Sequence, residues 1–229
     1  MKIRQLFDPE SSSFSYLLWD AETLDAALID PVRNMVGRDI ELIRKLGLTL
    51  RYTLETHIHA NHVTGSGMLR SAMDSMVLVH ENSRSKCHDV LLKDGDRIPL
   101  GNGRIGVIYT PGHTDSNVSY TIPGMVFTGD TLLIRSCGRT DYPSGDAGTL
   151  FDSITTRLFT LPGNTLVYPG HDYSGRACST IADEMAYNRQ LGNDTTRDEF
   201  IALARDRQLQ KPPASRDAFT SNLQCGLSD

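Results

Sequence analysis

The chain has 229 residues, and its 23 lysines and arginines stand against 28 aspartates and glutamates, for a formal net charge of −5. No block of basic residues stands out, which argues against nucleic acid as a partner because phosphate binding needs a basic surface. No apolar run approaches the roughly 20 residues that span a bilayer. The length suits one large α/β domain, so we expect a single domain over residues 1–229 with no nucleic-acid and no membrane partner.

The N-terminus and the cysteines bear on the cell compartment. Residues 1–5 contain no secretory apolar core, so we expect a cytoplasmic protein. The cysteines are widely spaced and form no CxxC pair, which favours reduced thiols over a disulfide framework. They are Cys87, Cys137, Cys178 and Cys225.

The chain begins with two predicted strands. Residues 2–7 and 13–19 have the alternation of half-buried strands, and the second places Phe14, Tyr16 and Leu18 on one face. Both segments therefore belong to a sheet that is covered on at least one side.

A cluster of histidines follows the next predicted strand, over residues 48–56. Three of the seven histidines in the chain lie within six residues here: His57, His59 and His62. Open α/β sheets place ligand-binding residues where a strand ends, and a histidine cluster at such a point usually holds a metal. We therefore expect a metal site here, followed by a helix over residues 61–72.

Three later apolar runs each end in a glycine and then a histidine or an aspartate. They are residues 105–109 before His113, residues 125–127 before Asp130, and residues 166–168 before His171. Glycine allows a sharp turn and a close approach of the backbone. We expect these side chains to converge with the histidine cluster at one edge of a sheet.

The C-terminal part predicts helices. Thr180 with Asp183, and Thr196 with Glu199, have the spacing of capping boxes that begin a helix. Strands and helices together predict an α/β domain with helices on both faces of mixed sheets.

Imidazole and carboxylate groups together suit zinc, iron, manganese or nickel. No cysteine lies beside a histidine in a zinc-finger pattern, which argues against a purely structural zinc. Two histidines and one carboxylate with open positions form the facial triad of non-haem Fe(II) oxygenases, and His57, His113 and Asp130 could supply it.

The histidine cluster resembles a known motif. The run Thr56-His57-Ile58-His59-Ala60-Asn61-His62 resembles the THxHxDH motif of the metallo-β-lactamase superfamily, and His113, Asp130 and His171 follow in the order of its remaining ligands. The resemblance implies an αββα sandwich of two mixed sheets flanked by helices, with the metal at one edge.

A narrower resemblance runs over essentially the whole chain and is to the persulfide dioxygenase family. It is carried by residues 56–67, Phe127 to Arg135, Cys137 to Tyr142, Tyr168 to Tyr173 and Asn222 to Gly226. The Cys-Gly-Arg-Thr-Asp stretch distinguishes this family from the related glyoxalase II hydrolases, which are not expected to carry it. The resemblance implies one Fe(II) per chain, glutathione persulfide and O₂ as substrates, sulfite and glutathione as products, and a homodimer.

The resemblance also implies roles for individual residues. The family's iron ligands carry over onto His57, His113 and Asp130. Five further residues are expected to support the ligands without binding the iron: His59, Asn61, His62, His171 and Asp172. Asn61 departs from the motif, where an aspartate is usual. Its neutral oxygen is a weaker ligand for a hard cation, so it favours a single iron over a dinuclear hydrolase site, and it could also change the hydrogen bonds that orient the ligands.

Glutathione carries two carboxylates, so a cationic side chain should line its groove. Arg139 is the first choice, because a guanidinium binds a carboxylate with two parallel hydrogen bonds; the alternative is a solvent-exposed or salt-bridged arginine. Tyr173 could offer a hydroxyl to the substrate, or pack at the sheet edge. Cys137 could be oxidised or persulfidated, although a small buried cysteine is the commoner role.

Three other functions stay open. A glyoxalase II-like thioester hydrolase would hold two metals, whereas a sensor of persulfide or iron would keep the fold without turnover. A β-lactamase is the most distant alternative, because no export leader is expected. Metal content and oxygen uptake with glutathione persulfide discriminate among the dioxygenase, the hydrolase and the sensor.

Overall fold

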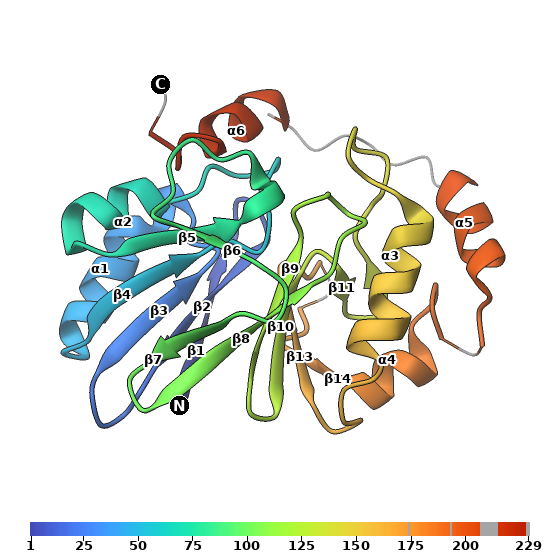
Figure 1. The fold of residues 1–229 in the computed structure, drawn as a ribbon, viewed down its shortest axis with the longest axis horizontal. Coiled ribbons are helices and arrows are strands. Elements are labelled where there is room, and N and C mark those ends of the chain that lie inside the picture. Colours follow the sequence, from blue (N-terminus) through green and yellow to red (C-terminus); the bar gives the residue numbers. More distant parts are fainter. Residues whose placement is uncertain (174, 193, 207–214, 228–229) are drawn as a thin grey trace.

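Two mixed β-sheets pack face to face and carry helices on their outer sides (Figure 1). This computed structural model describes residues 1–173, 175–192, 194–206 and 215–227, with the side chains of 215 and 216 left out. Among the residues described, none of the helices has the length and apolar character that crossing a membrane requires. The predicted αββα arrangement is confirmed.

The N-terminal half forms the first sheet. Its strands, in spatial order, are β1 (Lys2–Asp8), β2 (Ser13–Trp19), β3 (Asp25–Ile29), β4 (Thr49–Leu54), β5 (Met76–His80) and β6 (Val90–Leu92). The strands from β1 to β3 are antiparallel neighbours, whereas those from β3 to β6 run parallel. The helices of this half are η1 (Arg33–Met35), α1 (Val36–Lys45), α2 (Ser66–Met73) and η2 (Glu81–Ser83).

The second sheet is built from the C-terminal half. Its spatial order is β14 (Ser179–Thr180), β13 (Leu166–Pro169), β10 (Met125–Gly129), β9 (Val118–Ile122), β8 (Gly103–Tyr109) and β7 (Arg97–Leu100). A small ribbon joins β11 (Leu132–Leu133) to β12 (Ser136–Cys137). The helices are α3 (Ala147–Ser153), the π-helical η3 (Ile154–Leu158), α4 (Ile181–Tyr187), α5 (Arg197–Asp206) and α6 (Ser215–Asn222).

The layers follow from strands that are buried on both faces. In β2, Tyr16 and Leu18 enter the core between the sheets with Phe14, as predicted, whereas Leu17 faces the other way and packs with Val36 of α1. Successive side chains of a strand point to opposite faces, so a strand buried on both sides reads as a continuous apolar run. Each such aliphatic side chain contributes about 1.5–3 kcal/mol when fully buried.

The second sheet repeats this arrangement. Phe127 of β10 packs between the sheets, and its neighbour Val126 packs outward with Leu150 of α3 and Ile181 of α4. The helix start predicted at Thr180 is confirmed, because the Thr180 side chain caps α4 by accepting a hydrogen bond from the Asp183 backbone nitrogen at 3.1 Å. The outer helices are therefore held both by apolar packing and by caps.

Two local predictions were wrong. The helix expected from residue 61 begins at Ser66. The residues before it are used in tertiary contacts instead: the backbone nitrogen of Arg33 donates to the Val63 carbonyl at 2.8 Å, and that of Gly65 donates to the Pro31 carbonyl at 2.8 Å. These contacts hold the segment as an extended loop against the turn that follows β3.

The cysteines were also expected to be reduced, and two of them are not. Cys87 and Cys225 form a disulfide across a sequence separation of 138 residues, with a Cα–Cα distance of 5.6 Å. The fold brings them together because the C-terminal segment lies beside the loop after β5 (Figure 1). Cys137 and Cys178 lie outside this disulfide, the first buried and the second exposed.

Candidate metal centre

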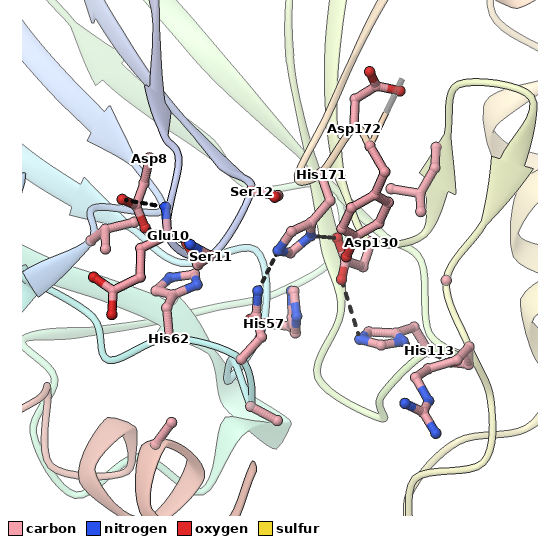
Figure 2. A pocket seen from close by; sticks show the side chains of 18 of the residues that line it. Asp8, Glu10, Ser11, Ser12, His57, His62, His113, Asp130, His171 and Asp172 are labelled. Carbon is pink, nitrogen blue, oxygen red and sulfur yellow. Dashed lines mark hydrogen bonds and ion pairs between the residues drawn. The ribbon is translucent and has the colours of Figure 1, made fainter. Parts of the chain in front are cut away.

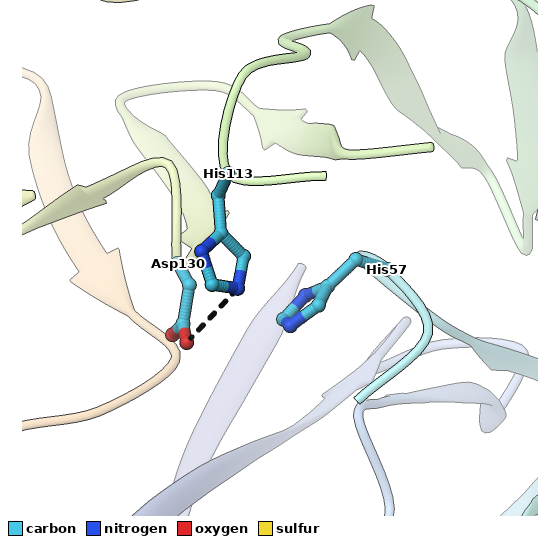
Figure 3. A group of neighbouring side chains, drawn as sticks. All are labelled: His57, His113 and Asp130. Atoms are coloured by element: carbon cyan, nitrogen blue, oxygen red, sulfur yellow. Dashed lines mark ion pairs between the residues drawn. The ribbon is translucent and has the colours of Figure 1, made fainter. Parts of the chain in front are cut away.

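Three donor side chains from both sheets meet at one edge of the sandwich (Figure 3). His57 lies in the loop after β4, His113 in the turn between β8 and β9, and Asp130 directly after β10. One possible ligand atom from each lies within 4.8 Å of the other two, and His113 Nε2 is 3.7 Å from Asp130 Oδ2. Two ligands that are each about 2.1 Å from one ion are at most about 4.2 Å apart, so the His113–Asp130 spacing suits a shared metal.

Hydrogen bonds fix which ring nitrogen each histidine presents. His113 Nδ1 lies 2.7 Å from the backbone carbonyl of Arg139, so it donates its hydrogen there and leaves Nε2 as the lone-pair atom. The Thr56 hydroxyl donates to Asp30 Oδ2 at 2.7 Å, so its oxygen accepts from His57 Nδ1 at 3.0 Å. Both histidines therefore aim Nε2 at the site, which is how outer partners orient metal ligands.

The site also favours the ionisation states that bind a metal. Burial holds the pKa of His57 well below its usual value and lowers that of His113, so both rings are neutral. Burial raises the pKa of Asp130, but the histidines around it, His171 first, outweigh that effect and hold the pKa below its usual range. Two neutral imidazoles and one carboxylate are the donor set of a facial triad.

His171 supports Asp130 from the other side of the carboxylate. Its Nδ1 donates to Asp130 Oδ1 at 2.5 Å, and its Nε2 accepts a hydrogen bond from the amide nitrogen of Asn61. The Ser13 hydroxyl also lies 2.9 Å from this Nε2. Asn61 therefore acts through its N–H group as a hydrogen-bond donor, a role that an aspartate could not fill without a protonated His171.

His59 lies beside His57, with ring centroids 4.1 Å apart, and its Nε2 faces two carboxylates. Its Nε2 is 3.1 Å from Asp30 Oδ1 and 3.5 Å from Glu55 Oε2, and all three residues are buried. Burial lowers the pKa of His59, but Asp30 and Glu55 outweigh burial and raise it to about 10. His59 thus forms a buried ion pair beneath the histidine loop, the name used here for residues 55–65 between β4 and α2.

A cleft of about 1090 Å³ opens over the site, large enough for a substrate of peptide size (Figure 2). His57, His62, His113 and Asp130 line it. His62 is buried, and its Nδ1 lies 3.2 Å from the Ser13 hydroxyl. The cleft therefore gives a substrate access to the three donor side chains.

Two of the three predicted substrate-binding residues, Arg139 and Tyr173, lie on the wall of this cleft, and Cys137 is the third. The guanidinium of Arg139 forms a salt bridge with Asp141 and sits over the Tyr142 ring, 5.1 Å from the ring centroid. Tyr173 is 77% exposed, with its ring parallel to that of His171. It is thus at the rim and not packed at the sheet edge.

Cys137 and Asp172 also line the cleft. The Cys137 thiol is buried and donates to Gln190 Oε1 at 2.8 Å. The Asp172 carboxylate accepts a hydrogen bond from the Arg176 backbone nitrogen at 2.6 Å and points away from the histidines in Figure 2. The redox role expected for Cys137 and the histidine-orienting role expected for Asp172 stay predictions.

The polar residues beneath the histidine loop were not among the predicted site residues. Asp30 accepts hydrogen bonds from both the backbone and the hydroxyl of Thr56, and Glu55 accepts from Ser66 at 2.5 Å. A usable signal was present, because Asp30 follows an apolar strand just as Asp130 does.

Comparison with known proteins identifies the family. The model of the metallo-β-lactamase superfamily matches residues 8–171. The human protein named persulfide dioxygenase ETHE1, mitochondrial, is 42% identical over 98% of this chain and 89% of its own length. The crystal structure of ETHE1 from Myxococcus xanthus is 44% identical, with a TM-score of 0.96 over 99% of this chain and 100% of that one.

A more distant structure shares the architecture. A metallo-β-lactamase from Staphylococcus aureus is 25% identical, with a TM-score of 0.89 over 100% of this chain and 73% of that chain. On the breadth of these matches, the chain belongs to the metallo-β-lactamase superfamily and, within it, to the persulfide dioxygenase family.

Proposed function

We propose that this protein is an Fe(II)-dependent dioxygenase that oxidises the sulfane sulfur of glutathione persulfide. Glutathione persulfide, O₂ and one water would give glutathione and sulfite, with the water supplying the third sulfite oxygen. The observation that carries the proposal is the convergence of His57, His113 and Asp130 at the floor of an open cleft. The human and Myxococcus relatives, both named for this family, support it over the hydrolase alternative.

The three side chains suit one iron, held as a facial triad with open positions. Iron held there would supply the redox chemistry that joins O₂ to the sulfur. The protein holds the donors for it: the Arg139 carbonyl fixes the His113 ring, Thr56 fixes the His57 ring, and His171 fixes the Asp130 carboxylate. Positioning of this kind is the protein's share of catalysis by a metal cofactor.

Arg139 and Tyr173 would bind the substrate on the cleft wall. Because the Arg139 guanidinium is paired with Asp141, a glutathione carboxylate must share it or displace Asp141. Tyr173 offers a phenolic hydroxyl at the exposed rim, and this hydroxyl can donate to the substrate. These contacts would align the persulfide toward the donors.

The rival function is a dinuclear thioester hydrolase of the glyoxalase II type. A second metal would need the remaining histidines and residue 61 as ligands. Here His59 faces Asp30 and Glu55, and His171 Nε2 is occupied by Asn61. This arrangement favours one iron over two metals.

An oxygen electrode tests the function directly. Iron-loaded protein is expected to consume one O₂ per sulfite formed from glutathione persulfide, and to leave S-lactoylglutathione intact. Thioester hydrolysis without oxygen uptake would support the hydrolase, and the absence of both activities in an iron-containing sample would support a sensor. A homodimer and a cytoplasmic location stay predictions, to be checked by sedimentation and by cell fractionation.

A further inference from the structure

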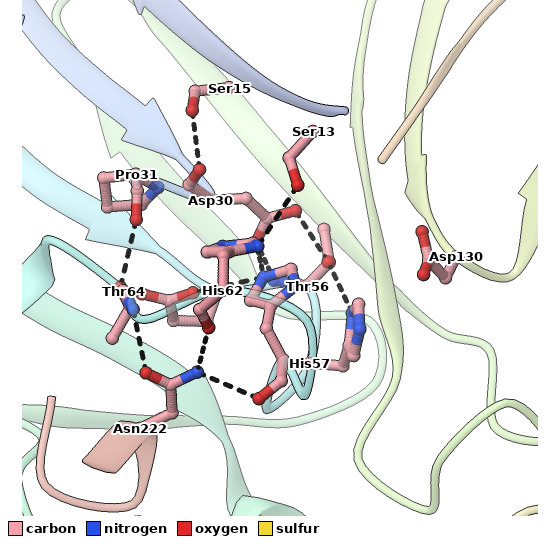
Figure 4. Close-up of polar contacts among 12 residues, drawn as sticks. Ser13, Ser15, Asp30, Pro31, Thr56, His57, His62, Thr64, Asp130 and Asn222 are labelled. Atoms are coloured by element: carbon pink, nitrogen blue, oxygen red, sulfur yellow. Dashed lines mark hydrogen bonds and ion pairs between the residues drawn. The ribbon is translucent and has the colours of Figure 1, made fainter. Parts of the chain in front are cut away.

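Residues 222–226, called the closing segment below, reach back to the histidine loop (Figure 4). Asn222, the last residue of α6, is 3% exposed, and its side chain makes three hydrogen bonds to this loop. Oδ1 accepts from the Thr64 backbone nitrogen at 2.8 Å, and Nδ2 donates to the carbonyls of His59 at 2.9 Å and His62 at 2.8 Å. One amide group thus spans six residues of the loop.

The loop depends on such a partner because residues 55–63 form neither helix nor strand. Their backbone groups cannot be paired within a secondary-structure element, and a buried backbone group without a partner is costly. Both amide hydrogens and the oxygen of the Asn222 side chain form hydrogen bonds with backbone groups of this loop. The amide group of an asparagine is planar and has two N–H donors and one acceptor oxygen, whereas an ionised aspartate has no donor.

Asn222 is itself fixed by the residues that follow it. The Cys225 carbonyl accepts from the Gly67 nitrogen at 3.0 Å, and the Leu223 carbonyl accepts from the Lys86 nitrogen at 2.7 Å. The disulfide between Cys87 and Cys225 ties the segment to the loop after β5. The closing segment is therefore anchored independently of the histidine loop that it holds.

Gly226 completes the contact. It has φ +73°, in the left-handed region, and a Cβ built on it would lie 2.1 Å from the Thr64 carbonyl oxygen. Only glycine allows both the conformation and the approach. Two separate features of the closing segment, an amide and a glycine, thus fit the same stretch of the histidine loop.

We propose that Asn222 is a positioning residue for the metal centre. It touches none of the three donors, and acts through the loop backbone to set where His57 stands relative to His113 and Asp130. His57 is two residues before the His59 carbonyl that Asn222 holds, whereas His113 and Asp130 come from the other sheet. The inference rests on the proposed function, since it takes His57 as a metal ligand.

The test replaces Asn222 with aspartate in the full-length protein. Asn222→Asp keeps the shape and the acceptor for Thr64, but sets an oxygen against the carbonyls of His59 and His62. We expect Co²⁺, used as a spectroscopic probe, to bind roughly tenfold more weakly than to wild type, as when outer partners of metal ligands are removed. We also expect an altered visible spectrum of the bound Co²⁺. If Asn222→Asp does not fold, Asn222→Ser, which keeps one donor, takes its place with an intermediate effect.

A matched control separates positioning from general destabilisation. Ile98 of β7 is buried between the sheets at the far edge of the second sheet, so Ile98→Ala lowers stability without contacting the loop. The proposal predicts wild-type Co²⁺ affinity and spectrum for Ile98→Ala at a comparable melting temperature. It is overturned if Asn222→Asp binds Co²⁺ as wild type does, or if both variants weaken binding equally. A wild-type protein that binds no metal, or two, would instead refute the proposed function.

Discussion

Asp130 lies between His113, a candidate metal ligand, and His171, which supports the carboxylate. One carboxylate oxygen accepts from His171 and the other faces His113, so the side chain links the metal ligands to their supporting hydrogen bonds. An ionised Asp130 carboxylate at this place would balance the charge of a bound cation.

Replacing Asp130 with alanine removes the single anionic ligand. We expect Asp130→Ala to retain less than about a tenth of the wild-type iron and to lose oxygen consumption in parallel, since two histidines alone hold Fe(II) weakly. Iron analysis and an oxygen electrode on the same preparation check this. Full iron content in the variant would show that Asp130 is not a ligand.

His171 and Asn61 allow a graded comparison along one chain of hydrogen bonds. His171→Ala leaves an Asp130 oxygen without its donor, and we expect metal affinity to fall by about 10–100-fold. Asn61→Ala removes one donor from His171 Nε2 but leaves the Ser13 hydroxyl at 2.9 Å, so its effect should be smaller. Co²⁺ titration measures both, and an Asn61 effect larger than the His171 effect would refute this order.

Among single residues, the sequence predicts the candidate metal-site residues better than it predicts the residues that hydrogen-bond to them. His57, His113, Asp130 and His171 each follow a strand, and strand ends converge at one edge of a sheet, so their meeting could be foreseen. The partners could not, because Asn222 lies 163 residues from His59 and no periodicity joins them. Only the folded chain shows which buried carbonyl needs a donor.

Among the elements, the closing segment of residues 222–226 carries the clearest stability prediction. The Cys87–Cys225 disulfide closes a loop of 138 residues, and cross-links over long loops stabilise by about 2–4 kcal/mol, mainly by restricting the unfolded chain. We expect Cys225→Ser to lower the free energy of unfolding by that amount in urea titrations under oxidising conditions.

Cys178→Ser is the matched control, because Cys178 is an exposed free thiol, and such a change should stay within about 0.5 kcal/mol. A reductant should lower wild-type stability toward that of Cys225→Ser and leave Cys225→Ser unchanged. Equal stability of wild type with and without reductant would contradict a stabilising disulfide.

The elements that were predicted wrongly share a physical reason. The stretch from Asn61 to Gly65 has residues that a helix tolerates, but bonds to Pro31, Arg33 and Asn222 hold it as a loop. The disulfide was missed because the spacing of cysteines carries no information about a pair brought together by tertiary structure. Tertiary contacts override local preference in both cases.

For the whole molecule, the site links the two sheets. His57 belongs to the first sheet and His113 and Asp130 to the second, so the three donors meet only when both sheets are packed together. Metal binding should therefore stabilise the whole fold. At a free Co²⁺ concentration of 100 times Kd, we expect a gain of about 2.7 kcal/mol.

Urea unfolding with and without Co²⁺ measures this gain, and Asp130→Ala serves as the control that should show almost none. The layered architecture itself was predictable, because the mix of predicted strands and helices indicated an α/β domain with helices on both faces of the sheets. An unchanged unfolding midpoint in saturating metal would mean that the donors do not share an ion across the sheets.

The most direct test of the account is diffraction from crystals of the iron-loaded protein at the iron absorption edge. We predict one anomalous peak per chain, bonded to His57 Nε2, His113 Nε2 and a carboxylate oxygen of Asp130. Two peaks in the cleft, or a single peak among Asp30, Glu55 and His59, would contradict it.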